Sequence, residues 1–281
     1  MAGRGQYTRP VVVVAFEGWN DAADAATSVI EHLADTFPTD LVFDIDSDDY
    51  YDYQIVRPRV ADGADGREIV WPKTSMQVSH LPERDLILVS GPEPNLHWQR
   101  FCSTLISAFR SVEPEMIIVL GAMLTDSPHS RPLPVTGNTS DVGLAHSLGL
   151  EPADYEGPTG ITGVLSDACH RAGLREVSLW ASVPHYVAAP PNPKATLALL
   201  ARLEDLLDVA LPLDDLPELA QAWQRGVDEL ASEDSEISDY IETLEAQQDE
   251  NGLPQATGDS IAREFERYLR RRDAGPSGPT N

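Results

Sequence analysis

Short runs of apolar residues recur along the first two thirds of the chain and are separated by longer amphipathic stretches. The segments Pro10–Phe16, Asp85–Ser90, Met116–Gly121 and Val177–Val183 are almost wholly apolar and rich in β-branched residues. Such runs are typical of strands that are buried on both faces of a sheet. The pattern therefore predicts a core of buried strands alternating with helices.

The intervening stretches carry apolar residues at helical spacing. Asn20 is a favourable N-cap for a first helix, with Asp21 and Asp24 placed in or near its first turn. A strand at Leu41–Ile45 would complete a strand–helix–strand unit, the building block of a parallel sheet. Further helices are predicted at Asn95–Val112, at about Ile161–Ala172 and at Asn192–Val209, and short strands near Glu68–Trp71 and Met76–His80. We therefore expect a three-layer α/β/α fold with a mixed, mostly parallel sheet.

The composition changes after Ala210. Between residues 204 and 259 there are seventeen Asp and Glu against one basic residue, Arg225, and no strand signal. We predict an α/β domain over residues 1–210 and an acidic helical region over 211–281, with a disordered tail from about residue 273.

Apolar residues in the acidic region recur at steps of 4, 3, 7, 4 and 3, which predicts a heptad seam with Asp234 at the skipped position. A break at Asn251–Gly258 would precede a last helix that buries Phe265 and ends in three arginines. Either this last helix or a neighbouring subunit would cover the seam, although a merely solvated acidic face is as common. The residues predicted to contact a partner are Trp223, Val227, Leu230, Ile237, Ile241, Leu244 and Phe265.

The net charge of −26 changes the set of plausible partners. So acidic a surface repels nucleic acids and anionic lipids, and it suits self-association or a protein with a basic face. No apolar run approaches the ~20 residues of a membrane helix, and the first residues are too polar for a signal peptide, so we expect a cytoplasmic protein. Cys102 and Cys169 lack metal spacing and are expected to pack as small apolar groups.

In open α/β sheets, ligands bind beyond the carboxyl ends of the strands. The rule predicts that polar residues from several loops lie together at this edge of the sheet, which we call the rim. They are Glu17, Asn20, Asp21, Glu93, Asp126, His129, Arg131 and His185. No phosphate-binding glycine motif follows the first strand, and the carboxylates there would repel a phosphate. We therefore expect no cofactor.

Asp126, His129 and His185 are the candidate catalytic residues. Asp126, Ser127, His129 and Ser130 lie in one short proline-flanked loop, whereas a working triad usually takes its members from separate segments. A turn that satisfies its own backbone is the simpler interpretation. The two histidines and a carboxylate could also bind a metal, but no pair of ligands has helical spacing, so we expect no metal.

A glycine-rich turn precedes the predicted helix at Ile161. Gly157, Thr159 and Gly160 lie in this turn, where free backbone N–H groups could hold a carboxylate. A tight turn without a ligand is an equally good interpretation.

Five stretches, in order, resemble the PAC2 family of proteasome assembly chaperone 2-like proteins in its actinobacterial branch. They are VVVAFEGWNDAADAAT (Val12–Thr27), LVSGPEPNLHW (Leu88–Trp98), LGAMLTDSPHSRPLPVTG (Leu120–Gly137), YEGPTGITGVL (Tyr155–Leu165) and LWASVPHYVAAPPNPKATLALL (Leu179–Leu200). The resemblance implies a phosphorylase/hydrolase-like α/β/α fold, homo-oligomers such as trimers, and proteasome subunits as possible partners.

Three hypotheses follow. The first is a non-enzymatic protein-binding or assembly factor. The second is a small-molecule hydrolase or transferase that uses Asp126, His129 and His185, which requires these groups within about 10 Å of one another. The third is an oligomeric scaffold.

Overall fold

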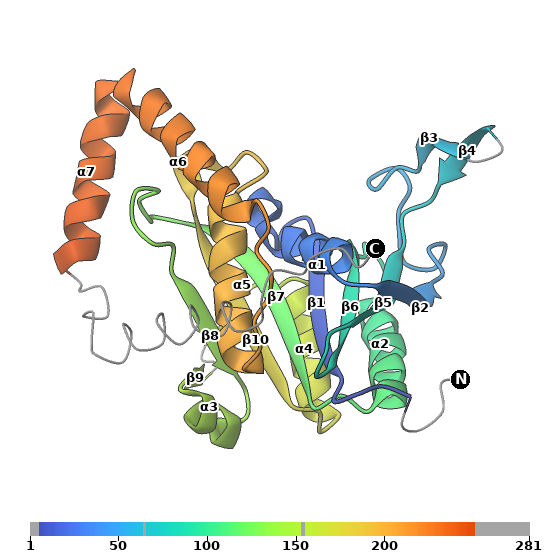
Figure 1. Cartoon of the computed structure of the whole chain (residues 1–281). Helices are drawn as coiled ribbons and strands as arrows, with labels where there is room; N and C mark the ends of the chain where they lie inside the picture. Colours follow the sequence, from blue (N-terminus) through green and yellow to red (C-terminus); the bar gives the residue numbers. More distant parts are fainter. Residues whose placement is uncertain (1–5, 64–65, 153–154, 251–281) are drawn as a thin grey trace, which may run out of the picture. The chain divides into compact units, whose positions relative to one another are not determined.

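The computed structural model describes residues 6–63, 66–152 and 155–250 (Figure 1). Its main sheet has eight strands in the order β2-β5-β6-β1-β7-β10-β8-β9, and a separate two-stranded sheet pairs β3 with β4. The strands are β1 (Val11–Glu17), β2 (Thr39–Ile45), β3 (Arg59–Gly63), β4 (Gly66–Val70), β5 (Thr74–His80), β6 (Asp85–Pro92), β7 (Met116–Thr125), β8 (Val135–Thr139), β9 (Glu151–Pro152) and β10 (Glu176–Pro184). The helices are α1 (Ala25–Thr36), α2 (Trp98–Val112), α3 (Val142–Leu148), α4 (Ile161–Arg171), α5 (Pro193–Leu207), α6 (Leu216–Ser232) and α7 (Ser235–Glu250), with short 3₁₀ turns at Ala22–Asp24 and His185–Val187.

The fold is the predicted three-layer α/β type with a mixed sheet. β1 lies at its centre and pairs in parallel with β6 and β7, whereas β5 pairs antiparallel with both β2 and β6. The predicted strand–helix–strand unit is therefore corrected: β2 runs in the direction of β1 but lies three places away, at the edge of the sheet. Propensity locates a strand but does not choose its neighbour.

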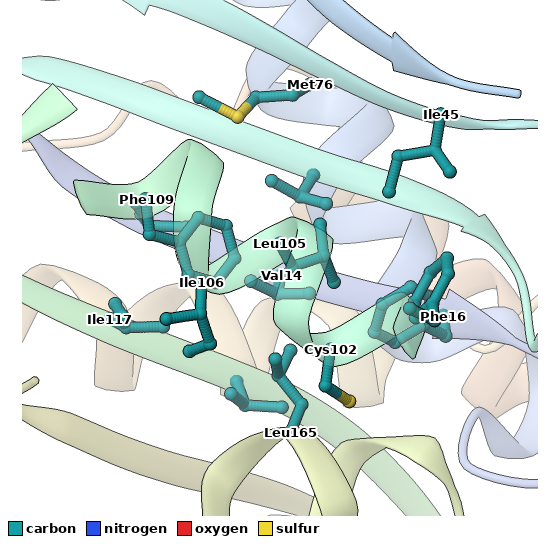
Figure 2. Close-up of a cluster of buried hydrophobic side chains, with 14 of the residues drawn as sticks. Val14, Phe16, Ile45, Met76, Cys102, Leu105, Ile106, Phe109, Ile117 and Leu165 are labelled. Atoms are coloured by element: carbon teal, nitrogen blue, oxygen red, sulfur yellow. The ribbon is translucent and has the colours of Figure 1, made fainter. Parts of the chain in front are cut away.

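The core on one face of the sheet is formed by the alternate residues of the central strands. Val12, Val14 and Phe16 of β1 pack with residues of α2 and α4, including Phe101, Phe109 and Leu165 (Figure 2). Both cysteines are buried in this cluster, as expected, and burial raises the pKa of the Cys102 thiol to about 12. Because side chains alternate along a strand, Val11 and Val13 face the other side of the sheet, and α1 packs against β1 there.

The first helix begins later than predicted. α1 starts at Ala25 after two residues in the left-handed region, Ala23 and Asp24, and Asn20 does not cap it. The capping acceptor is the buried Asp21 side chain, which accepts from the Ala26 N–H at 2.6 Å and the Thr27 N–H at 3.1 Å. A carboxylate placed there satisfies two of the free N–H groups at the helix start.

The predicted single heptad helix is also corrected, because α6 ends at Ser232 and α7 begins at Ser235. Asp234, assigned above to a skipped seam position, lies in the break and accepts from the Glu236 N–H at 2.9 Å. Val227, Ile241 and Leu244 are buried, Trp223 is half-buried, and Leu230 and Ile237 are exposed. Phe265, the predicted break and last helix, and the tail lie outside the described residues.

The chain divides into two compact units, each described by itself below. Among the described residues, the first unit comprises those up to 123 and those from 136 to 180, and the second comprises residues 124–135 and 181–250. The second unit thus combines the loop after β7 with α5, α6 and α7. Within the described ranges, no helix has the length and apolar character needed to span a membrane.

Candidate functional site

In the first unit, a buried polar cluster joins the end of β1, the end of β6 and the start of α4. Glu93 Oε1 accepts from the Asn20 side-chain amide and from the Ile161 backbone N–H, both at 2.8 Å. Asn20 Oδ1 in turn accepts from the Thr162 hydroxyl at 2.9 Å. The N-terminus of α4 therefore already holds a carboxylate, and that carboxylate is the chain's own Glu93.

Gly160 is required by this arrangement. A Cβ atom at Gly160 would lie 2.3 Å from Asn20 Oδ1, far closer than two such atoms approach in proteins. The glycine thus allows Asn20, which is 1% exposed, to reach Thr162. The other first-unit residues of the predicted rim, Glu17, Gly157 and Thr159, are exposed.

In the second unit, His129 lies at the centre of a hydrogen-bonded chain. Its backbone N–H donates to the Tyr186 phenol oxygen at 2.7 Å, and its Nδ1 lies 2.8 Å from the same oxygen. The phenol therefore donates to Nδ1, which assigns the ring proton to Nε2, 2.9 Å from Asp228 Oδ1. The His129 side chain is 1% exposed, and its bonds connect the loop to α6 and to the 3₁₀ turn that follows β10.

Lys194 also bonds this loop, through the His129 backbone. Its ammonium donates to the His129 carbonyl oxygen and, at 2.7 Å, to Gln224 Oε1. Burial lowers the pKa of Lys194 to about 8, and nearby Asp228 partly opposes this shift. Burial also raises the pKa of Tyr186 to about 12, so this phenol stays protonated near neutral pH and keeps the proton that it donates to His129 Nδ1.

Asp126 and His185 form a more accessible pair. His185 Nδ1 lies 3.3 Å from Asp126 Oδ1, and the Tyr240 hydroxyl donates to the same oxygen at 3.2 Å. The His185 ring contacts Tyr186, with centroids 5.7 Å apart, and Tyr186 also contacts the His129 ring at 5.7 Å. The three candidate catalytic residues are thus brought together around Tyr186.

The same loop binds α7 through charged groups. Arg131 donates to both carboxylate oxygens of Asp249, at 3.2 and 2.9 Å, and lies 3.5 Å from Glu245. The Ser130 hydroxyl donates to Glu245. Arg131, predicted as a ligand-binding residue, therefore joins the acidic helix to the loop.

The arrangement does not assemble a serine nucleophile. The Ser127 hydroxyl accepts from Thr125, and the Ser130 hydroxyl is bonded to Glu245. In the part of the chain that the structure describes, neither His129 nor His185 bonds a serine hydroxyl. Within the same residues, no group of three His, Cys, Asp or Glu side chains could hold a metal ion.

The sequence did not single out Tyr186, Lys194 or Asp228. Asp228 is one acidic residue among many, so no local signal separates it from its neighbours. Lys194 is one of only two lysines, and this rarity is a signal that could have directed attention to it.

The chain belongs to the PAC2 family, whose sequence model matches residues 15–231. The crystal structure of a Streptomyces avermitilis PAC2 family protein is 52% identical to it, with a TM-score of 0.79 and coverage of 83% of this chain and 99% of that one. A Mycobacterium tuberculosis proteasome-assembly chaperone homologue is 46% identical, with a TM-score of 0.76 and coverage of 82% and 99%.

A more distant structure, the Pyrococcus furiosus archaeal proteasome activator PbaB, shares the fold at 16% identity, with a TM-score of 0.63 and coverage of 81% and 96%. No curated protein gives a significant match. The family membership and the fold class predicted from the sequence are confirmed.

Proposed function

We propose that this protein is a non-enzymatic protein-binding assembly factor that acts on proteasome subunits. The observation that carries the proposal is the 46% identity, over nearly the whole of that chain, to a proteasome-assembly chaperone homologue. The proposal implies a cytoplasmic location and a homo-oligomeric state.

The bonding of the polar residues supports binding rather than catalysis. Glu93 is held by Asn20 and the start of α4, Asp21 caps α1, and His129 is enclosed by Tyr186 and Asp228. Groups engaged in this way give rigidity to the loops that follow the strands, and rigid loops are a suitable platform for a protein partner.

Exposed aromatic side chains of the first unit are the best candidates for contact with a partner. Trp19, in the turn after β1, is 70% exposed, and Tyr155, before α4, is 73% exposed. Trp and Tyr dominate the binding energy of many protein interfaces.

The test is titration of the purified protein against proteasome α and β subunits. We expect saturable binding to one of them, weakened at least tenfold by Trp19→Ala or Tyr155→Ala. Val142→Ala is the matched control, because Val142 is 72% exposed on α3 of the same unit. Absence of binding to isolated subunits and to assembled particles alike would reject the proposal.

The second candidate is a small-molecule hydrolase or transferase. The observation that favours it is the 3.3 Å contact between Asp126 and the half-exposed His185 beside Tyr240. It predicts turnover of ester or amide substrates that disappears in His185→Ala and Asp126→Asn. Native protein without activity on a broad ester and amide panel would eliminate this alternative.

A further inference from the structure

The helices α6 and α7 meet at a corner that the local sequence does not require (Figure 1). α6 ends at Ser232 and α7 begins at Ser235, so two residues separate them, and the first of these, Glu233, already has helical backbone angles. Sharp breaks in helices usually occur at proline or glycine, but residues 229–240 contain neither. The corner therefore depends on contacts rather than on a helix-breaking residue.

The apolar pattern continues across the corner in a single phase. The seam predicted from the sequence keeps its heptad spacing from α6 into α7, with Asp234 at the position where the helices separate. Two independent helices have no need of a common phase. A continuous α6–α7 helix would place Leu230 and Ile237, which are 64% and 39% exposed, on one stripe with the buried Val227 and Ile241. The sequence is thus suited to a straight helix as well as to the bent one.

The contacts of α6 lie before the break and do not involve α7. Gln224 Oε1 accepts from the Lys194 ammonium at 2.7 Å, and Asp228 Oδ1 lies 2.9 Å from His129 Nε2. These bonds join α6 to α5 and to the 124–135 loop. α6 therefore keeps its position whatever conformation the break adopts.

The contacts of α7 with the 124–135 loop are polar and partly open to solvent. The Tyr240 hydroxyl donates to Asp126 at 3.2 Å. Arg131 donates to both carboxylate oxygens of Asp249 and lies 3.5 Å from Glu245. The side chains of Arg131 and Asp249 are 32% and 48% exposed, and ion pairs of this kind contribute little to stability. α7 can thus leave the loop at a small cost.

We propose that α7 is exchanged between two copies of the chain: the break straightens, and α7 of each copy binds the 124–135 loop of the other. The inference deepens the oligomeric part of the proposed function and rests on it. The exchange re-forms between copies the bonds that α7 makes within one copy, which is why swapping an element is a low-cost route to a dimer.

The exchange also covers apolar surface that the single chain leaves exposed. On a twofold axis the two straight helices would cross near residue 234, so Leu230 of one copy would meet Ile237 of the other. The exposed acidic side chains of the corner, Glu229, Glu233, Glu236 and Asp239, would approach one another and oppose the contact. Salt screens this repulsion, so exchange should increase with salt concentration.

The test is disulfide trapping between full-length copies that each carry one new cysteine. A Ser130→Cys copy labelled with heavy nitrogen is equilibrated with an unlabelled Glu245→Cys copy in about 1 M salt, where charges act over about 3 Å, and is then oxidised. Positions 130 and 245 are bonded to each other within one chain. Mass spectrometry of the linked peptides shows whether they also meet between two copies.

We expect the link between copies to form at least ten times faster than with Gln247→Cys in place of Glu245→Cys. Gln247 is exposed on α7, about 200° around the helix from Glu245, so it reports random collision. The native Cys102 and Cys169 are buried and do not compete.

Two variants of the break, each introduced into both copies, test the mechanism. Ser235→Pro places proline at the first position of α7, which suits the bent form and interrupts a continuous helix, so trapping should fall at least tenfold. Ser235→Ala is its control. Asp234→Leu removes the acceptor for the Glu236 N–H and completes the apolar seam, so trapping should increase. Circular dichroism verifies that each variant is folded.

Trapping no faster than with Gln247→Cys would overturn the proposal. So would trapping that Ser235→Pro leaves at the rate of Ser235→Ala, or that Asp234→Leu does not increase. Because only the purified chain is used, the outcome is independent of binding to proteasome subunits.

Discussion

Replacing Glu93 by alanine removes the single acceptor that joins β6, the turn after β1 and α4. Two donors lose their partner, the Ile161 N–H and the Asn20 amide, on residues that are 0% and 1% exposed. An orphaned buried donor costs about 1–3 kcal/mol. Water can reach the space left by the half-buried side chain, so we expect each donor to cost an amount near the lower end of this range. The two donors together should lower the unfolding free energy by about 2–3 kcal/mol.

The variant Glu93→Gln tests the effect of the carboxylate charge separately from the effect of the two hydrogen bonds. The glutamine keeps an acceptor oxygen and loses the interaction of a carboxylate with the α4 N-terminus, so the loss should be about 0.3–1 kcal/mol. Urea unfolding followed by circular dichroism measures both variants, with the exposed neighbour Glu156→Ala as control. The argument fails if Glu93→Ala lies within about 0.5 kcal/mol of native protein, the range of ordinary surface substitutions, or is no worse than Glu93→Gln.

Three further predictions concern other groups. Burial raises the pKa of Glu176, so above the ordinary value of 4.5 the folded protein binds more protons than the unfolded protein and loses stability as the pH rises. The unfolding free energy of Glu176→Gln, measured with urea, should therefore rise relative to that of native protein between pH 5 and 7.5. A difference that stays constant over this range would contradict the prediction. Competitive acetylation read by mass spectrometry should give Lys194 a midpoint near pH 8, moved lower by Asp228→Asn because the carboxylate raises that pKa; an unchanged or higher midpoint would refute the assignment. Arg131→Ala should expose α7 to limited proteolysis faster than Arg171→Ala does, since Arg131 binds Asp249 at both carboxylate oxygens, and equal cleavage rates would argue against this role.

Much of the fold was predictable because buried strands and helices have recognisable patterns of apolar residues in the sequence. Runs such as Pro10–Phe16 are apolar throughout because both faces of β1 are covered, and Gly173 marks the end of α4 by its left-handed backbone. The edge strand β2 was located, but its antiparallel pairing with β5 depends on contacts between distant segments. The exposed hairpin strand β3 lacked a strong pattern because little of it is buried.

The site was less predictable than the fold. Sequence reasoning selected Asn20, Glu93 and Gly160 as neighbours at one rim, yet it could not show that Glu93 itself fills the start of α4. Similarly, the acidic composition of α6 and α7 was plain, whereas the specific bonds of Asp228 and Asp249 to the loop depend on tertiary packing. The residues that join distant elements carry no local signature.

The long sequence separation between the 124–135 loop and its partners matters during synthesis. The loop leaves the ribosome 57 residues before Tyr186, which binds His129, and 118 residues before Asp249, which binds Arg131. At ~5–20 residues per second, α7 follows the loop by about 6–24 seconds. A nascent or prematurely ended chain therefore has this loop without its contacts to Tyr186 and Asp249, and the loop reaches its final conformation only after α7 has been made.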